Sequence, residues 1–310
     1  MNDSPKISQT TKARVRKAAL DLSYLPDGTA RNLKKKRTDT IGVFLGDMSG
    51  PIYGELIHGI QEVLSKTDYD MIVCSNHNGK VTTAQRTLSE KRVDGAIILT
   101  PFIDDEFILS MAATRAPIVV LDRELRGRNV CSVLIDNEKG GFLATSHLIG
   151  LGYGSIHYLS GPSKSQDEAK RFAGYRRALR ENGIEFDSAW RIEGDFTEDS
   201  GYSGVKERID RGEVPEALFC ANDEMAIGAM MCLQEAGIVV PEKVSIVGFD
   251  DIRLSSYVRP RLTTIRRPIL EMGLLAAHVL LKAIAGEDGG GPGVTLSVDL
   301  VERESCRRRE

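Results

Sequence analysis

Strand-like and helix-like segments alternate along most of this chain, and that alternation limits the folds it can adopt. A first set begins at residue 40. Its strand-like segments lie at 40–45, 70–75, 94–99, 117–122 and 130–136, and its helical segments lie at 51–66, 82–91, 104–114 and 138–151. Alternation of this kind is typical of a doubly wound parallel sheet with helices on both faces.

The same pattern then restarts. Strand-like segments at 155–160, 190–194, 216–221 and 244–250 alternate with helical segments at 168–182, 198–211 and 223–236. The chain has 310 residues and is 41% hydrophobic, which is enough for two packed lobes. The sequence therefore predicts an α/β protein of two doubly wound parallel-sheet lobes with a cleft between them.

A third part of the chain follows the second set. It contains the segment 259–268, a helical stretch at 269–285, a glycine-rich turn at 286–293 and a strand-like end at 295–305. We expect a first lobe of residues 38–160 and 266–289, and a second lobe of residues 161–265 and 290–310. Lobes joined by several strands can only pivot, which is a hinge arrangement.

The first 37 residues differ in charge from the rest. They hold ten Lys or Arg and three Asp, whereas the whole chain has a net charge of −3, so residues 38–310 carry −10. Between residues 26 and 37, Leu33 is the one strongly apolar side chain, too little to bury a helix. Such a segment fits a polyanionic partner, and a solvated tail is the alternative.

A short amphipathic helix precedes this basic segment. Val15, Ala18, Ala19 and Leu22 fall at helical spacing, and Ser8 is placed to cap the helix. One apolar stripe of that size does not stabilise a helix alone. We expect this helix to need partners, or to dock elsewhere.

Several classes of protein are disfavoured by what the sequence lacks. No apolar run approaches the roughly 20 residues that cross a membrane, and no signal peptide is evident, so we expect a cytoplasmic protein without membrane contact. The five cysteines are scattered and suit reduced thiols. Hydrolase, metalloprotease and P-loop motifs are missing, and the five histidines show no metal-ligand spacing. We expect no catalysis, no cofactor and no metal.

Family-like phrases recur in order over essentially the whole chain. They include KRVDGAIIL (91–99), VLIDNEKGGFLATSHLIGLGY (133–153), LSGPSKSQDEAKRFAGYRRAL (159–179), EALFCANDEMAIGAM (216–230) and VSIVGFDDIRLSSYVRPRLTTIRRP (244–268). On these phrases the chain resembles the lactose-repressor (LacI/GalR) family of transcriptional regulators, whose core is similar to the periplasmic sugar-binding proteins. The resemblance implies a homodimer that binds operator DNA and a small effector.

The beginning of the chain departs from this family. Family members start with a helix-turn-helix whose second helix enters the major groove. Met1 stands here where that recognition helix ends, so residues 1–37 would be a partial headpiece and hinge segment. We expect either that translation begins upstream or that this is a truncated regulator, and we favour an upstream start.

The resemblance assigns DNA contacts to the hinge segment. In the family this segment becomes helical on the operator, pairs with its dimer mate and wedges an apolar side chain between base steps, and Leu33 occupies that position. Five cations around it would neutralise phosphates: Arg31, Lys34, Lys35, Lys36 and Arg37. The alternative for these five is a solvated linker.

Polar residues at strand ends are the candidates for effector binding. Arg171 and Asp250 match positions that in relatives hold opposite ends of a polar effector, and the alternative is that they pair with each other. Asp122 and Asn222 are placed at the mouth of the cleft. Four more candidates complete the set: Tyr53 and Phe219, which could stack on a ring although such aromatics are more often core, and Ser165 and Asp167 in a lobe-crossing loop.

The identity of the effector is left open by these residues. Carboxylates, amides and an aromatic ring favour a sugar or similar polar metabolite, while purine-binding relatives use the same scaffold. The predicted function is a ligand-responsive, DNA-binding transcriptional regulator that acts as a repressor. A sugar-binding solute receptor, or a truncated regulator without its own base readout, is the alternative.

Overall fold

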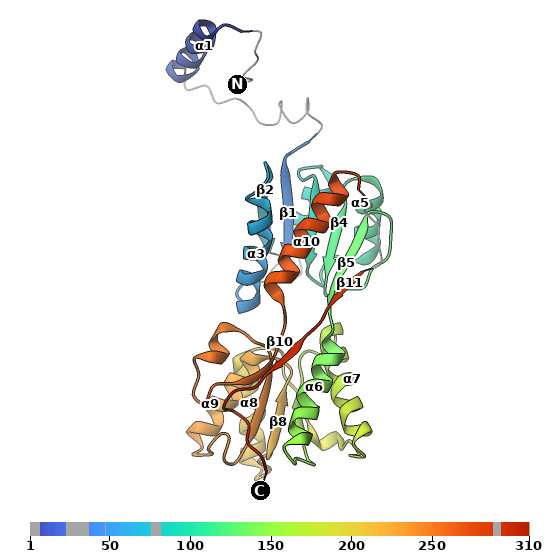
Figure 1. Cartoon of the computed structure of the whole chain (residues 1–310), viewed down its shortest axis with the longest axis vertical. Helices are drawn as coiled ribbons and strands as arrows, with labels where there is room; N and C mark the ends of the chain where they lie inside the picture. The colour runs from blue at the N-terminus through green and yellow to red at the C-terminus, as the bar shows by residue number, and fades with distance from the viewer. Residues whose placement is uncertain (1–6, 23–36, 47, 76–81, 288–292, 310) are drawn as a thin grey trace.

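The computed structural model describes residues 7–22, 37–46, 48–75, 82–287 and 293–309. From Thr40 onward the described chain forms two α/β lobes stacked along the long axis of the molecule (Figure 1). Each lobe is built on a six-stranded sheet, and the two sheets share no strand. The two-lobed fold expected from the alternating segments is confirmed.

The first lobe has the strand order β11-β5-β4-β3-β1-β2. All neighbouring strands in it are parallel. The strands are β1 (Thr40–Leu45), β2 (Asp70–Ser75), β3 (Gly95–Leu99), β4 (Ile118–Leu121), β5 (Val130–Ile135) and β11 (Val294–Leu296). Its helices are α3 (Pro51–Leu64), α4 (Thr82–Ser89), α5 (Asp105–Thr114) and α10 (Ile269–Ile284).

Both faces of this sheet are covered, as continuous apolar strands require. Side chains of α3 and α10, such as Leu56 and Leu280, join the core on one face, with Ile41 and Val43 of β1. Side chains of α4 and α5 form a separate apolar cluster with Phe44 on the other face. The alternation of β1 side chains between the two clusters follows from the two-residue period of a strand.

The second lobe repeats this plan with the strand order β12-β10-β9-β8-β6-β7. Its strands are β6 (His157–Leu159), β7 (Arg191–Ile192), β8 (Ala217–Cys220), β9 (Ser245–Asp250), β10 (Thr263–Arg266) and β12 (Asp299–Val301), and β12 alone among these six pairs antiparallel. Its helices are α6 (Asn137–Gly150), α7 (Gln166–Glu181), α8 (Glu198–Asp210) and α9 (Asp223–Glu235). Short 3₁₀ turns occupy Ser188–Trp190 and Arg253–Ser256.

The described chain passes between the lobes at three places: from β5 to α6, from β10 to α10 and from β11 to β12. The expected lobe boundaries at residues 160 and 290 differ from these crossings. Strand β6 and helix α6 belong to the second lobe, because β6 pairs with β8 and β7, whereas β11 belongs to the first lobe through its pairing with β5. The strand-like end expected at 295–305 is therefore split between two sheets.

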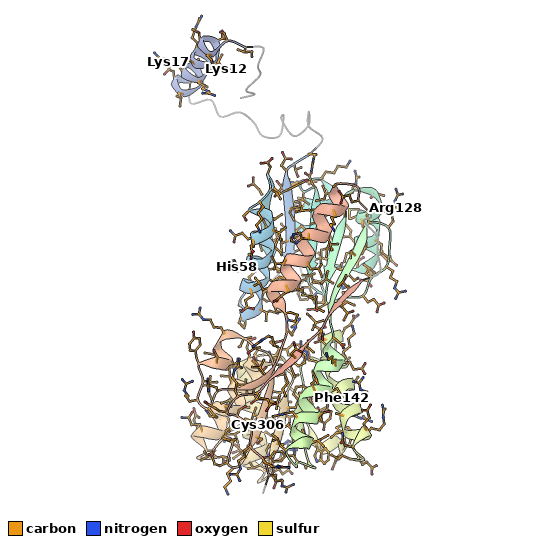
Figure 2. All side chains as sticks on the ribbon, viewed as in Figure 1. Lys12, Lys17, His58, Arg128, Phe142 and Cys306 are labelled. Atoms are coloured by element: carbon orange, nitrogen blue, oxygen red, sulfur yellow. The ribbon has the colours of Figure 1, made fainter. Side chains whose placement is uncertain are left out.

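At the N-terminal end, helix α1 spans Gln9–Asp21, and the side chain of Ser8 accepts a hydrogen bond from the backbone N–H of Thr11, as expected for its cap. None of the residues of α1 is buried, and Lys12 and Lys17 project from it (Figure 2). Within the described ranges, no helix is both long and apolar enough to cross a membrane.

Candidate functional site

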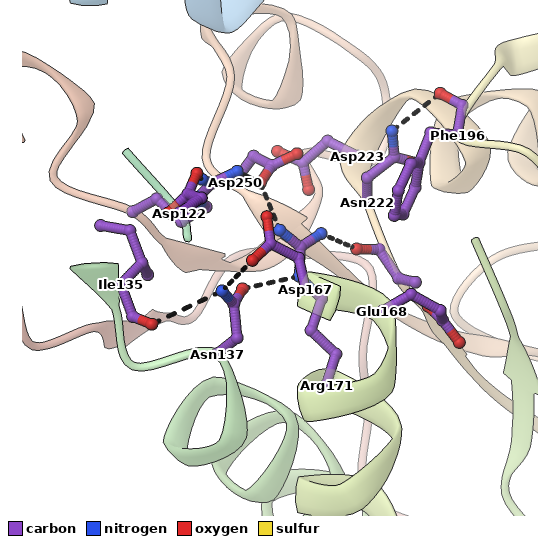
Figure 3. Close-up of polar contacts among 12 residues, drawn as sticks. Asp122, Ile135, Asn137, Asp167, Glu168, Arg171, Phe196, Asn222, Asp223 and Asp250 are labelled. Atoms are coloured by element: carbon purple, nitrogen blue, oxygen red, sulfur yellow. Dashed lines mark hydrogen bonds and ion pairs between the residues drawn. The ribbon is translucent and has the colours of Figure 1, made fainter. Parts of the chain in front are cut away.

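The parallel strands of both lobes end toward the junction between the lobes (Figure 1), and polar side chains gather there (Figure 3). Asp122 directly follows β4 of the first lobe, while Asp250 ends β9 of the second. Both have left-handed backbone conformations, with φ of +52° and +113°. Ligands of open α/β sheets sit outside the carboxyl ends of strands, so this junction is the candidate binding site.

Arg171 enters the junction from α7. Helices α6 and α7 approach so closely that a Cβ on Gly141 would lie 2.0 Å from the carbonyl oxygen of Arg171, and glycine is therefore required at this crossing. Arg171 is 2% exposed. Its guanidinium lies 4.0 Å from the centre of the Phe249 ring and also faces the Phe196 ring. Packing against the two rings thus fixes the position of the guanidinium independently of its hydrogen bonds.

The polar partners of Arg171 come from three different strand ends. Its Nε donates to Asn137 Oδ1 at 2.9 Å, and one terminal nitrogen donates to the carbonyl oxygen of Ala221. The other terminal nitrogen lies 3.6 Å from Asp250 Oδ1. Arg171 and Asp250 thus lie in the arrangement given as the alternative, in which the two pair with each other.

A second arginine, Arg267, joins the two lobes. It lies just after β10, where the chain crosses back to the first lobe, and it is 6% exposed. One terminal nitrogen donates to Asp122 Oδ2 at 2.6 Å and the other to Asp250 Oδ1 at 3.1 Å. Because these two aspartates belong to different lobes, Arg267 forms an ion-pair bridge across the junction, here called the interlobe bridge (Asp122, Arg267 and Asp250).

The interlobe bridge leaves some of its hydrogen-bonding atoms without a partner. Asp122 Oδ1 and Arg267 Nε are both buried and have no hydrogen-bond partner among the described residues. Burial raises the pKa of the Asp122 carboxyl group to about 6, the charge of Asp167 adds to the rise, and Arg267 and Arg171 oppose it. One acceptor and one donor thus remain available in a water-poor site, where an unpaired polar group is costly.

The remaining candidates on the second lobe lie at helix starts around this site. Ser165 caps α7 by accepting from the N–H of Glu168, and Asp167 in the first turn accepts from Asn137 Nδ2 at 2.9 Å. Asn222 caps α9 and donates to the carbonyl oxygen of Phe196 at 2.8 Å. The N-termini of these helices face the junction, and their backbone N–H groups can donate hydrogen bonds there.

Two buried acids stabilise the turns behind these groups. Asp223 accepts from the backbone N–H of Ile252 at 2.9 Å and from the hydroxyl of Thr264 at 2.5 Å. Glu168 accepts from the backbone N–H of Gly161 at 2.9 Å. Burial raises the pKa of both Asp223 and Glu168 above the usual carboxyl value. These acids hold the loops after β6 and β9 in place.

The two aromatic candidates differ in their placement. Phe219 is fully buried in β8 with its ring edge-on to Tyr158, so that it is part of the second-lobe core. Phe219 therefore takes the core position given as the alternative, because a parallel sheet that is covered on both faces buries the side chains of its inner strands. Tyr53 lies in the first turn of α3, half-buried, with its ring against Gly50.

A hollow of about 190 Å³ opens beside the interlobe bridge. It is lined by Glu55, Asp251, Arg266, Arg267, Pro268, Ile269, Leu270 and Glu271. A larger groove, of about 570 Å³, lies over the outer face of α7 around Arg176, Arg180 and Phe186. Its lining shares no residue with the interlobe bridge, so the bridge and not the larger groove is the candidate site. The described part of the chain holds no cluster of His, Cys, Asp or Glu that could bind a metal.

Most of the predicted DNA-contacting residues lie outside the described residues: Arg31, Leu33, Lys34, Lys35 and Lys36. Arg37 is described and half-exposed. Its guanidinium donates to the hydroxyl of Tyr69 and lies 3.9 Å from Asp94 Oδ2. Arg37 therefore contacts the first lobe at the point where the chain enters β1.

Sequence reasoning missed Arg267 and Asn137. Both lie close to strand ends: Arg267 directly follows β10, and Asn137 lies two residues after Ile135, the last residue of β5. The strand-end rule that selected Asp122 and Asp250 would have selected these two as well. Phe196 and Phe249 were also missed, because only the fold reveals that their rings lie against the Arg171 guanidinium.

Comparison with known proteins agrees with this geometry. A profile of the periplasmic binding protein-like domain matches residues 145–306. The chain is 34% identical over 315 residues to the HTH-type transcriptional repressor PurR of Haemophilus influenzae, covering 99% of this chain and 93% of that protein.

Solved structures of regulators have the same fold. A LacI-family regulator from Enterococcus faecium with bound ribose superposes with a TM-score of 0.80 at 30% identity, covering 87% of this chain and all of that one. The lac repressor dimer bound to operator and the anti-inducer ONPF gives a TM-score of 0.79 at 29% identity, covering 92% and 99%. The chain belongs to the LacI family of transcriptional regulators, with a periplasmic-binding-protein-like core.

Proposed function

We propose that this chain is a homodimeric, effector-responsive repressor that acts in the cytoplasm without catalysing a reaction. A small polar effector, most simply a sugar, binds at the lobe junction and changes the affinity for operator DNA through the hinge segments. The observation that carries the proposal is the interlobe bridge, with Arg171 beside it. An effector that takes over any of these ion pairs changes the free energy of lobe closure.

The unsatisfied atoms of the bridge support a hydroxyl-bearing effector. A hydroxyl group can donate to Asp122 Oδ1 and accept from Arg267 Nε at the same time, which satisfies both buried atoms. A carboxylate could accept from Arg267 but could not donate to Asp122. The E. faecium relative was solved with ribose, which agrees with this choice.

The three crossings of the described chain between the lobes support a pivoting motion of one lobe against the other. Entry to the junction requires the lobes to separate, because Arg171 and Arg267 are buried between strand ends. The crossings after β5, β10 and β11 permit a pivot and restrain sliding. The effector can shift DNA affinity only through its different affinities for the open and closed arrangements.

The DNA half of the proposal is supported by the relatives and by the basic hinge segment. PurR is a repressor by its name, and the lac repressor was solved as a dimer on operator DNA. The hinge segment places Leu33 among five cations, which suits phosphate contacts around an apolar wedge.

Thermal unfolding against a panel of pentoses, hexoses, disaccharides and purine bases tests the effector site. We expect one or more sugars to raise the melting temperature of the wild-type chain, and Asp250→Asn to abolish that rise. Asp210→Asn is the matched control, because Asp210 ends α8 and pairs with Lys206 at the protein surface. A sugar-induced shift that survives in Asp250→Asn would place the effector elsewhere, and a shift with purine bases alone would overturn the sugar assignment.

Binding of a labelled DNA duplex at increasing salt concentration tests the DNA half. We expect affinity to fall steeply with salt, because the hinge cations displace counterions from phosphates. A chain that binds no duplex at any salt concentration contradicts direct DNA binding and leaves the solute-receptor alternative.

A further inference from the structure

The chain enters the first lobe at residues 37–39, and one carboxylate holds this entry. Asp94 immediately precedes β3, the strand beside β1. Its Oδ1 accepts from the backbone N–H of Thr38 at 2.8 Å and from the Thr38 hydroxyl at 3.0 Å, and its Oδ2 accepts from the backbone N–H of Asp39 at 2.9 Å. Both carboxylate oxygens are thus used on the incoming chain.

Neighbouring contacts fix the same turn. The backbone N–H of Asp94 donates to the carbonyl oxygen of Thr40 at 2.8 Å, and the N–H of Asp70, at the start of β2, donates to the carbonyl oxygen of Asp39 at 2.9 Å. Asp39 has a φ of +51°, a left-handed conformation that persists where surrounding contacts enforce it. The direction in which the chain enters β1 is therefore set by Asp94 and not by the strand alone.

Asp94 lies far from the effector site. The start of β1 is at the end of the first lobe remote from the second lobe (Figure 1). Asp94 is at the amino end of β3, whereas the interlobe bridge is at the carboxyl ends, so the length of the strand separates the two. Arg37, whose Nε lies 3.9 Å from Asp94 Oδ2, is the last cation of the basic segment. The Asp94 carboxylate thus lies between the first-lobe sheet and the basic segment that is predicted to bind DNA.

We propose that Asp94 is a positioning residue that couples the basic segment to the first lobe. A movement of the lobe reaches the segment only if the end of the segment moves with the lobe, and the Asp94 carboxylate makes residues 37–39 part of the sheet edge. This inference rests on the proposed function for its consequence on DNA. The anchoring itself is independent of DNA.

Amide hydrogen exchange of the full chain tests the anchoring. In Asp94→Asn the side-chain amide has a single acceptor oxygen and cannot accept from both the Thr38 and Asp39 N–H groups. We therefore expect exchange at residues 38 and 39 to rise about tenfold or more. Asp94→Glu keeps a carboxylate and should restore part of the protection. Asp104→Asn is the matched control, because Asp104 accepts from a backbone N–H of the same lobe at the start of α5 and does not touch residues 37–39.

Titration of a labelled DNA duplex over a range of salt concentrations tests the coupling. We expect Asp94→Asn to lower the affinity several-fold without changing the slope of log affinity against log salt, because no phosphate contact is lost. Removing a negative charge alone would raise the affinity, so a fall must come from lost positioning. Lys35→Ala, by contrast, should lower the affinity and also make it less dependent on salt, because one phosphate contact is lost.

The possible results separate this inference from the proposed function. If the wild-type chain binds no DNA, the proposed function fails, and exchange at residues 38 and 39 still decides whether Asp94 anchors the entry. If exchange is unchanged in Asp94→Asn, the anchoring is refuted. If exchange rises but affinity stays at the wild-type value or increases, the coupling is refuted. If Asp94→Asn folds poorly, Thr38→Val replaces it as the test variant. This substitution removes only the hydroxyl donor to Asp94, so we expect a smaller rise in exchange.

Discussion

Replacing Arg267 by methionine tests the interlobe bridge most sharply. Methionine keeps much of the volume and removes the guanidinium that donates to both Asp122 and Asp250, in hydrogen bonds of 2.6 and 3.1 Å. Asp250 keeps Arg171 at 3.6 Å as a partner. Asp122 loses its hydrogen-bonded cation while its other oxygen is already unpaired, so the cost falls mainly on Asp122.

The expected loss is large because the pair is buried. Removing one partner of a buried ion pair costs about 3–5 kcal/mol, and the retained Arg171 places this case near 3 kcal/mol. Adding Asp122→Asn removes the uncompensated charge, so the double variant Arg267→Met/Asp122→Asn should recover about 2 kcal/mol of that loss. The lobes should also separate more readily in Arg267→Met, because the bridge is the contact that spans them.

Urea unfolding and small-angle X-ray scattering measure the two effects. Arg303→Met is the matched control, because Arg303 pairs with Asp251 within the second lobe. It should lower the free energy of unfolding without increasing the radius of gyration, whereas Arg267→Met should change both. Equal radii for the two variants, or no recovery in the double variant, would refute the reasoning.

Three further predictions concern Asp122, the crossing of α6 and α7, and Leu33. The pKa of Asp122 is raised from 3.8 to about 6. The folded chain therefore binds this proton more tightly than the unfolded chain, and stability falls by about 3 kcal/mol as pH rises through that window, a dependence that denaturant titrations should find missing in Asp122→Asn. Gly174→Ala places a Cβ 2.0 Å from the carbonyl oxygen of Glu138; it should cost about 1–3 kcal/mol and weaken effector binding by calorimetry, unlike Gly150→Ala on open α6 surface. Leu33→Ala should weaken DNA binding in a filter assay and leave effector affinity unchanged; equal loss of both would contradict the separate roles of the hinge segment and the lobe junction.

The sequence predicted the alternating elements because each has its own local signal. Buried parallel strands such as β1 and β9 read as apolar runs, and helices begin at capping residues such as Ser165 and Asn222. The lobe boundaries were harder to predict. Strand β11 and strand β12 are separated by two residues and join different sheets, and no local pattern encodes which sheet a short strand joins.

The candidate site was predicted in part, for a similar reason. Strand-end position identified Asp122, Asp250 and Asn222, because the carboxyl ends of parallel strands meet at one edge. The role of Arg267 depends on a contact between residues 145 positions apart in the chain, which periodicity does not reveal. Phe219 was misplaced since a strand end and a strand interior look alike in an apolar run.

A small molecule bound between the lobes is expected to change how the chain binds DNA. The most direct test of this claim is a titration of labelled duplex with wild-type protein, with and without the sugar that gives the largest thermal shift, repeated with Arg171→Gln. We expect the sugar to change the DNA dissociation constant of the wild-type chain by at least several-fold and to leave that of Arg171→Gln unchanged. A sugar that binds tightly between the lobes and leaves DNA affinity the same would contradict the claim.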